Sequence, residues 1–150
     1  MELGLNGKTV IVTGGGSNIG RAIVHVFAAE GSNIVIAELA LAQGEQVAAE
    51  VAAMNTGSKV KVVATDVTDA ASVDSMVEQA GAEFGTVDVF INNVGWTVDR
   101  LFMDKPREEL EKEVQVNLWG APCGGSWNDR APGWLYRLHQ FRRRSHGWVS

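Results

Sequence analysis

Residues 13–20, with the sequence TGGGSNIG, join two segments of different periodicity. Before them, residues 8–13 (KTVIVT) form a short run rich in β-branched side chains, which is typical of a strand. After them the apolar residues recur at helical spacing until Gly31, and we expect them to form one face: Ile19, Ala22, Ile23, Val26 and Phe27. The sequence therefore predicts a strand, a glycine turn and a helix.

The same alternation continues along the chain. Further buried strands are predicted at residues 33–37, 60–65 and 87–91, and an alanine-rich helix at about 41–54. Thr68 is a plausible cap for the next helix, whose apolar face has these members: Val73, Met76, Val77, Ala80 and Phe84.

A last helix is predicted with Asp104 as its cap and Pro106 in its first turn. Its inner side would carry three apolar residues at four-residue steps: Leu110, Val114 and Leu118.

Strands that are nearly unbroken apolar runs and alternate with helices indicate an α/β fold with a parallel sheet covered on both faces. Because crossover connections are right-handed, we expect a Rossmann-type doubly wound sheet of order 3-2-1-4, truncated after the fourth strand and its following helix. The fourth strand would then be an exposed edge.

The glycine turn predicts an anion site. A backbone that turns sharply and lets a pyrophosphate approach its amides has no room for a Cβ, and the next helix offers its N-terminal amides. Glycine pairs occur in many loops, so the evidence for an anion site is the position of these glycines at a strand-to-helix junction.

Two acidic residues follow the next two predicted strands. Glu38 ends the second strand, about where a carboxylate takes the ribose hydroxyls of NAD and repels the extra phosphate of NADP. Asp66 ends the third strand and could accept from an adenine amino group. The alternatives are a solvated carboxylate at a strand end for Glu38 and a cap or turn residue for Asp66.

Four motifs, TGGGSNIG, Asp66-Val67, NNVG at 92–95 and VNLWG around Asn117, occur in the order and approximate spacing of the short-chain dehydrogenase/reductase family. The chain resembles this family over residues 1 to about 121. The resemblance implies a dinucleotide, with NAD preferred because of Glu38, and these binding residues: Gly14, Ser17, Asn18, Ile19, Gly20, Glu38, Asp66, Val67, Asn93 and Gly95. Asn18 stands where the family usually has glycine, and asparagine tolerates left-handed backbone best among the other residues.

The resemblance also implies hydride transfer between an alcohol or ketone and the nicotinamide, with Asn117 as the catalytic asparagine. The family's Tyr-x-x-x-Lys motif is missing, because Tyr136 is followed four residues later by Gln140 and no lysine follows Lys112. A phenol without a neighbouring cation keeps a pKa near 10 and is a poor base. We therefore expect an oxidoreductase by lineage that is inactive as this chain, or alternatively a non-catalytic NAD-binding module.

Charge divides the chain after Ala121. Residues 1–121 carry 8 basic and 17 acidic side chains, whereas residues 122–150 carry 5 arginines and one aspartate. We therefore predict a dinucleotide-binding domain at 1–121 and a non-homologous, disordered tail at 122–150.

Three interpretations of residues 122–150 compete: a nucleic-acid or membrane-surface tag, a natural disordered ending, and a shifted reading frame. Starting each codon of residues 134–147 one base later permits Gly-x-Ile-Val-x-Ile-Ser-Ser-Asp-Ala-Gly, which resembles the family's next strand with its catalytic serine. We favour the shifted frame, and sequencing the gene across codons 115–150 tests it.

The bulk composition argues against several other classes of protein. The net charge of -5 argues against a general nucleic-acid binder, and no apolar stretch is long enough to span a bilayer. The single cysteine cannot form an internal disulfide, so we expect a cytoplasmic protein. The expected partners are the dinucleotide, a small alcohol or ketone if the catalytic set is complete, and copies of the same chain in a homo-oligomer.

Overall fold

The computed structural model describes residues 3–119. Its strands are β1 (Thr9–Thr13), β2 (Asn33–Glu38), β3 (Val60–Ala64) and β4 (Val89–Ile91). Its helices are α1 (Asn18–Ala29), α2 (Leu41–Ala53), α3 (Ala70–Phe84) and α4 (Arg107–Val114), with a 3-10 turn η1 (Phe102–Asp104) and a π-helical turn η2 (Gln115–Trp119). The predicted boundary after residue 121, the predicted tail and the shifted-frame interpretation of it lie outside the described residues.

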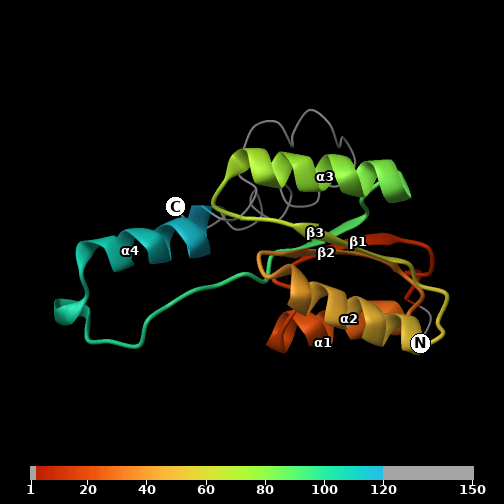
Figure 1. Cartoon of the computed structure of the whole chain (residues 1–150), viewed down its shortest axis with the longest axis horizontal. Coiled ribbons are helices and arrows are strands. Elements are labelled where there is room, and N and C mark those ends of the chain that lie inside the picture. Colours follow the sequence, from red (N-terminus) through yellow and green to blue (C-terminus); the bar gives the residue numbers. More distant parts are fainter. Residues whose placement is uncertain (1–2, 120–150) are drawn as a thin grey trace, which may run out of the picture.

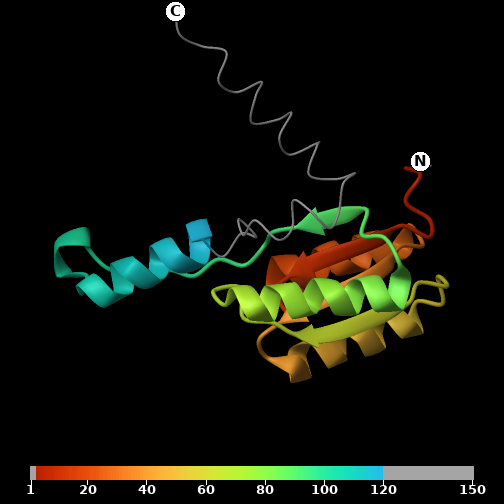
Figure 2. The same cartoon turned by 90° about the horizontal axis from the view of Figure 1, so that it is seen from above.

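The four strands form one parallel sheet of order β3-β2-β1-β4, which confirms the predicted order and α/β class. Helices α1 and α2 cover one face of the sheet and α3 covers the other (Figure 1). Helix α4 lies to the side, beyond the ends toward which the strands point (Figure 2). In the described residues, β4 is an edge strand, because β1 is its one partner.

Strands β1 and β2 are buried on both faces because alternate apolar side chains enter two separate cores, whereas the outer strands β3 and β4 are mostly half-buried and so are less buried than predicted. Val10, Val12, Ile34 and Ile36 pack with α1 and α2, and all four are fully buried. Their neighbours Ile11, Val35 and Ala37 pack with α3 on the opposite face. Unbroken apolar runs are what a parallel sheet between two helical layers requires.

The predicted inner face of α1 is correct only in part: Ile23 and Phe27 pack against the core, but other predicted members face away from it. The buried residues of the helix are Gly20, Val24 and Ala28, whereas Ile19 is 71% exposed and Val26 is 62% exposed. Gly20 lies against the preceding loop, where a Cβ would be 1.9 Å from the carbonyl oxygen of Gly14. A count of large apolar residues misses such a face.

Two further local predictions need correction. Thr68 does not cap α3, because the carboxylate of Asp69 accepts from the backbone N–H of Ala71 at 3.0 Å in the N-cap position. Strand β4 begins at Val89 rather than at Val87. Asp88 precedes the strand, and its side chain accepts from Lys8 Nζ and from the backbone N–H of Thr9, both at 2.9 Å.

Helix α4 also begins later than predicted. Pro106 occupies the N-cap position and Asp104 belongs to the 3-10 turn η1 before it. The predicted inner side is wrong, since Val114 is 49% exposed and Leu118 is 64% exposed, whereas Val116 is buried. The wider turn η2 changes the helical spacing after Val114, and α4 does not lie on the sheet (Figure 1).

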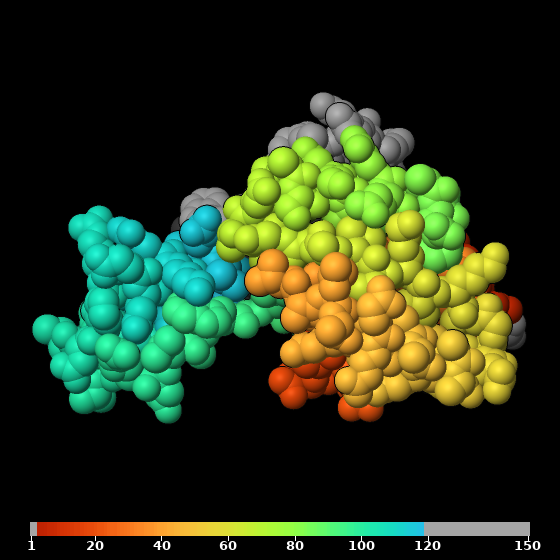
Figure 3. All heavy atoms as spheres, viewed as in Figure 1, coloured from red at the N-terminus to blue at the C-terminus, as the bar shows by residue number. Residues whose placement is uncertain are grey.

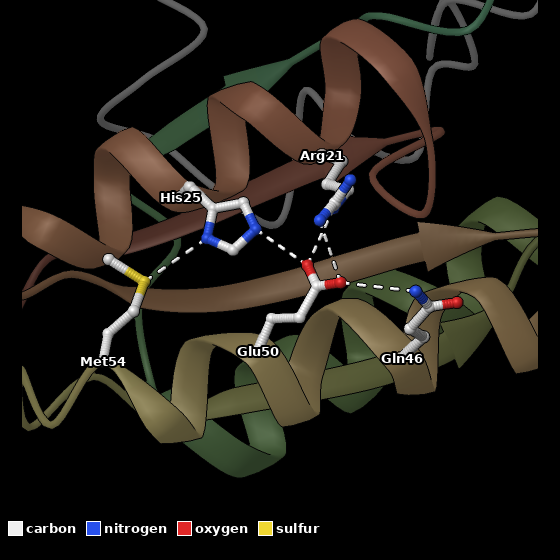
Figure 4. A network of polar contacts seen from close by, with 5 residues as sticks. All are labelled: Arg21, His25, Gln46, Glu50 and Met54. Carbon is white, nitrogen blue, oxygen red and sulfur yellow. Dashed lines mark hydrogen bonds and ion pairs between the residues drawn. The ribbon is translucent and has the colours of Figure 1, made fainter.

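Helices α1 and α2 are joined by a polar network centred on Glu50 (Figure 4). Arg21 donates two hydrogen bonds to the Glu50 carboxylate, at 2.7 and 3.0 Å, and His25 Nε2 lies 2.9 Å from Glu50 Oε2. The hydrogen bonds from Arg21 and then from His25 lower the pKa of Glu50. On its other side His25 Nδ1 lies 3.3 Å from the Met54 sulfur. The network fixes the lateral position of α2 against α1.

Candidate cofactor site

One cavity lies at the carboxyl edge of the sheet, where ligands bind in open α/β folds. It has a volume of about 590 Å³ and is lined by residues from the glycine turn, the ends of β2 and β3, the segment after β4, and α4 with η2. All the residues predicted to bind the dinucleotide line it: Gly14, Ser17, Asn18, Ile19, Gly20, Glu38, Asp66, Val67, Asn93 and Gly95. Residues far apart in the sequence therefore meet at one site, as the strand order predicts.

The glycine turn has no room for side chains. A Cβ on Gly20 would lie 1.9 Å from the carbonyl oxygen of Gly14, and a Cβ on Gly16 would lie 2.9 Å from the Glu38 carboxylate. Gly14 has a φ of 64° and Asn18 a φ of 45°, so the asparagine adopts the left-handed conformation expected of it. The loop thus brings backbone amides and the N-terminus of α1 to the wall of the cavity, where an anion is stabilised.

The Glu38 carboxylate is oriented by three backbone N–H groups. Oε2 accepts from Gly16 at 3.0 Å, and Oε1 accepts from Leu39 at 2.9 Å and from Ala40 at 3.3 Å. The carboxylate thereby links the end of β2 to the glycine turn. A carboxylate held in this way can accept a hydrogen bond from a ligand hydroxyl group, and it repels a ligand phosphate.

Asp66 follows β3 and is held by the next turn. Its Oδ1 accepts from the Thr68 hydroxyl at 2.7 Å and from the Thr68 backbone N–H at 2.9 Å. These two hydrogen bonds, the hydroxyl one first, lower the pKa of Asp66. The side chain is therefore an ionised acceptor at neutral pH on the wall of the cavity.

Thr13 and Asn93 fasten the glycine turn to the segment after β4. The Thr13 hydroxyl accepts from the backbone N–H of Asn93 at 3.0 Å and lies 3.3 Å from the Ile91 carbonyl oxygen. Asn93 Nδ2 donates to the carbonyl oxygens of Thr13 and Gly14, at 3.0 and 3.2 Å. Thr13 is not among the predicted site residues, although a hydroxyl group at the end of an apolar strand could have indicated it.

Asn117 lies in η2 and does not line the cavity itself. Its Oδ1 accepts from the backbone N–H of Trp96 at 2.9 Å, and its Nδ2 donates to the Trp96 carbonyl oxygen at 2.7 Å. Trp96 does line the cavity, and Lys112 Nζ lies 4.2 Å from the centre of its ring. The side chain of Asn117 thus positions a wall of the site, and Trp96 and Lys112 are wall residues that the sequence analysis missed.

Glu113 fixes the loop between β4 and α4. Its Oε1 accepts from the Thr97 hydroxyl at 2.8 Å and from the Val98 backbone N–H at 3.1 Å, and it pairs with Lys105. The hydrogen bond from Lys105, followed by those from Val98 and Thr97, lowers the pKa of Glu113 to about 2. A carboxylate with three donors from one loop is the main anchor of that loop on α4.

Acid should release this loop. Because the pKa of Glu113 is lower in the folded chain than its ordinary value of 4.5, its contribution to stability is present above pH 4.5 and is lost as the pH falls through about 2. We expect the amide resonance of Val98 in nuclear magnetic resonance spectra to move over that pH window. In Glu113→Gln it should not titrate there, and an identical pH response in the variant would contradict the assignment.

The described residues 3–119 contain no group of three or more metal-ligating side chains and no helix that is long and apolar enough to cross a membrane. Among the described residues that line the cavity, the charged side chains are those of Glu38, Asp66 and Lys112. The chemistry that this set offers is the binding of a ligand with hydroxyl and anionic groups.

The sequence model of the short chain dehydrogenase family matches residues 8–123. The chain belongs to the short-chain dehydrogenase family. The match covers the glycine turn, both cavity carboxylates and Asn117. Membership of this family, which the sequence motifs predict, is therefore confirmed.

Curated family members support the oxidoreductase lineage. An uncharacterized oxidoreductase of Thermotoga maritima is 40% identical over 116 residues, which are 77% of this chain and 44% of the relative. The 3-oxoacyl-(acyl-carrier-protein) reductase of Escherichia coli is 37% identical over 116 residues, 77% of this chain and 46% of that enzyme. The chain thus spans less than half the length of these relatives.

Solved structures of the family share the fold. The 3-ketoacyl-(acyl-carrier-protein) reductase of Brucella melitensis, complexed with NADH, has a TM-score of 0.71 and 34% identity, over 77% of this chain and 46% of that chain. The L-sorbose reductase of Gluconobacter frateurii, complexed with NADPH and L-sorbose, has a TM-score of 0.75 and 30% identity, over 81% of this chain and 46% of that chain. Relatives of this fold therefore bind either nicotinamide dinucleotide.

Proposed function

We propose that this chain is the dinucleotide-binding part of an oxidoreductase that transfers hydride between a nicotinamide cofactor and an alcohol or ketone. One observation carries the proposal: a single cavity of about 590 Å³ is lined by the N-terminus of α1, by Glu38 and by Asp66. A dinucleotide needs an anion site, a ribose acceptor and an adenine acceptor at one sheet edge. The crowding that a Cβ would meet at Gly16 and Gly20 supports a tight turn between β1 and α1, which brings the backbone amides of α1 to the cavity.

In this proposal the backbone of the glycine turn and of Ser17 to Gly20 holds the pyrophosphate, Glu38 accepts from the adenosine ribose, and Asp66 with Val67 holds the adenine. The nicotinamide, when bound, supplies hydride transfer. Asn93 and Gly95 lie on the wall nearest to Trp96, where we place the nicotinamide. NAD is the preferred cofactor because the Glu38 carboxylate would repel a 2′-phosphate.

We propose that Asn117 is the member of the family's catalytic set that is present in these 150 residues. Its side chain is fully engaged with the backbone of Trp96, so its direct effect is to position the reacting end of the cavity. The sequence contains no Tyr-x-x-x-Lys segment to act as a proton donor. A non-catalytic NAD-binding module is therefore the second candidate. The cytoplasmic location and assembly into a homo-oligomer stay predictions from the sequence and the family.

Cofactor binding is tested by fluorescence titration with NADH, with ADP-ribose and nicotinamide mononucleotide as competitors. We expect ADP-ribose to compete well, because it carries every group assigned to the glycine turn, Glu38 and Asp66. Nicotinamide mononucleotide should compete weakly. Failure of NADH to bind to a chain that circular dichroism shows to be folded would refute the proposal.

Turnover separates the two candidates. NADH oxidation is followed with a panel of ketones, beside the variant Asn117→Ala. Turnover that disappears in the variant supports the oxidoreductase, whereas binding without turnover supports the module. Turnover that persists unchanged in Asn117→Ala would contradict the proposed role of Asn117.

A further inference from the structure

Lys112 differs from the neighbouring cations in having no acidic partner among the described residues. On and around α4, Arg100 pairs with Glu109, Lys105 with Glu113, and Arg107 with Glu111, as three separate ion pairs. No described carboxylate lies within 4.0 Å of Lys112 Nζ, although α4 is rich in glutamate. The side chain instead places its ammonium group 4.2 Å from the centre of the Trp96 ring.

This arrangement directs a positive charge to the cavity. Among the described residues that line the cavity, Lys112 is the one with a positive side chain. An ammonium group over an aromatic face is held by the ring quadrupole without losing its net charge. A carboxylate partner would have neutralised it, so the contact with Trp96 orients the charge and leaves it available to a ligand.

The position of this charge identifies which part of a ligand would meet it. Trp96 is held at both backbone atoms by Asn117, so Lys112 and Asn117 lie at the same end of the cavity. The two cavity carboxylates, Glu38 and Asp66, follow β2 and β3, and they disfavour an anionic group near them. Beyond the pyrophosphate assigned to the glycine turn, a further anionic group of a bound ligand is therefore more stable at the Trp96 end, beside Lys112, than beside Glu38 or Asp66. Figure 3 shows α4 and the preceding segment as a lobe set apart from the main body, with open surface between them.

We propose that Lys112, oriented by Trp96, binds an anionic group, a carboxylate or a phosphate, on the substrate. The inference rests on the proposed function, since it requires that the Trp96 end of the cavity receives the substrate and the Glu38 end the adenosine. It narrows the substrate class to alcohols or ketones that carry a negative charge. Lys112 is a binding residue in this proposal and takes no part in proton transfer.

The test compares two probes of similar shape, 3-oxobutanoate and its neutral methyl ester, by ligand-observed nuclear magnetic resonance on the full chain. Each titration is run with and without NADH, so that a failure of cofactor binding leaves the comparison of the two probes readable. We expect the wild-type chain to bind 3-oxobutanoate more tightly than the ester, by up to about fivefold, as one exposed ion pair allows.

Lys112→Met should remove that preference and leave the dissociation constant of NADH unchanged, and Lys112→Arg should retain the preference. Lys59→Met is the matched control. Lys59 also has no described carboxylate within 4.0 Å and it does not line the cavity, so its loss changes net charge alone. Circular dichroism verifies that each variant is folded.

Two results would overturn the proposal. The first is equal binding of the two probes by the wild-type chain. The second is a loss of NADH affinity in Lys112→Met, which would assign the charge to a cofactor phosphate instead of the substrate. If NADH does not bind to the wild-type chain at all, the proposed function fails, whereas a carboxylate preference that depends on Lys112 would still establish the anion site.

Discussion

Replacing Gly20 with alanine will prevent α1 from packing against the glycine turn. A Cβ at this position would lie 1.9 Å from the carbonyl oxygen of Gly14 and 2.7 Å from the Asn93 amide nitrogen. Because the first of these atoms is backbone, the strain cannot be relieved by a rotamer change. We expect the free energy of unfolding to fall by about 3 kcal/mol or more, and NADH binding to be lost.

The matched control is Gly81→Ala in α3, where a Cβ would meet nothing within 4 Å. Alanine is the better helix former, so this variant should be more stable than the parent chain by about 0.5–1 kcal/mol. Urea denaturation followed by circular dichroism measures both values. A Gly20→Ala variant as stable as the parent chain would show that α1 is not packed on Gly14 in solution.

Replacing Glu38 with glutamine will relax the preference for NADH over NADPH. The carboxylate accepts three backbone hydrogen bonds, and an amide must turn its NH2 group toward at least one of those N–H donors. The variant therefore loses both the charge that repels a 2′-phosphate and part of the order at the end of β2. Since like charges brought together cost several kcal/mol, we expect the ratio of the two dissociation constants to fall at least about tenfold.

Fluorescence titration with each dinucleotide measures this ratio. Glu45→Gln, an exposed position on α2 that does not line the cavity, removes the same charge and should leave the ratio unchanged. If the ratio changed equally in both variants, the preference between the two dinucleotides would depend on the net charge of the chain and not on the position of Glu38. A parent chain that prefers NADPH would contradict the proposed cofactor preference.

Much of the fold could be predicted from the sequence because its signals are local. Each strand is a short apolar run, and the glycine turn indicates a tight connection between the first strand and the first helix. The end of each strand then determines which residues share an edge of the sheet, so the sequence alone predicts that Glu38 and Asp66 lie at one site, where both line the cavity. Such predictions need only the strand order and the direction of the chain.

The errors arise where tertiary contacts override local pattern. The inner face of α1 is set by the contact of Gly20 with Gly14, and glycine contributes nothing to an apolar count. Asp69, one residue after the predicted cap, occupies the N-cap position of α3, while the Thr68 hydroxyl donates to Asp66 in the preceding turn. The contact of Lys112 with Trp96 joins residues 16 positions apart through a loop, and no spacing rule predicts it.

The network around Glu50 has a consequence for ligand binding. Arg21 and His25 on α1 contact the Glu50 carboxylate on α2. Near the starts of the same two helices, the Glu38 carboxylate accepts a hydrogen bond from the Gly16 backbone N–H. Hydrogen bonds therefore connect the amides that would meet a pyrophosphate to the carboxylate that would meet a ribose before any ligand arrives. Less conformational entropy is then lost when the adenosine half of a cofactor binds, which favours affinity.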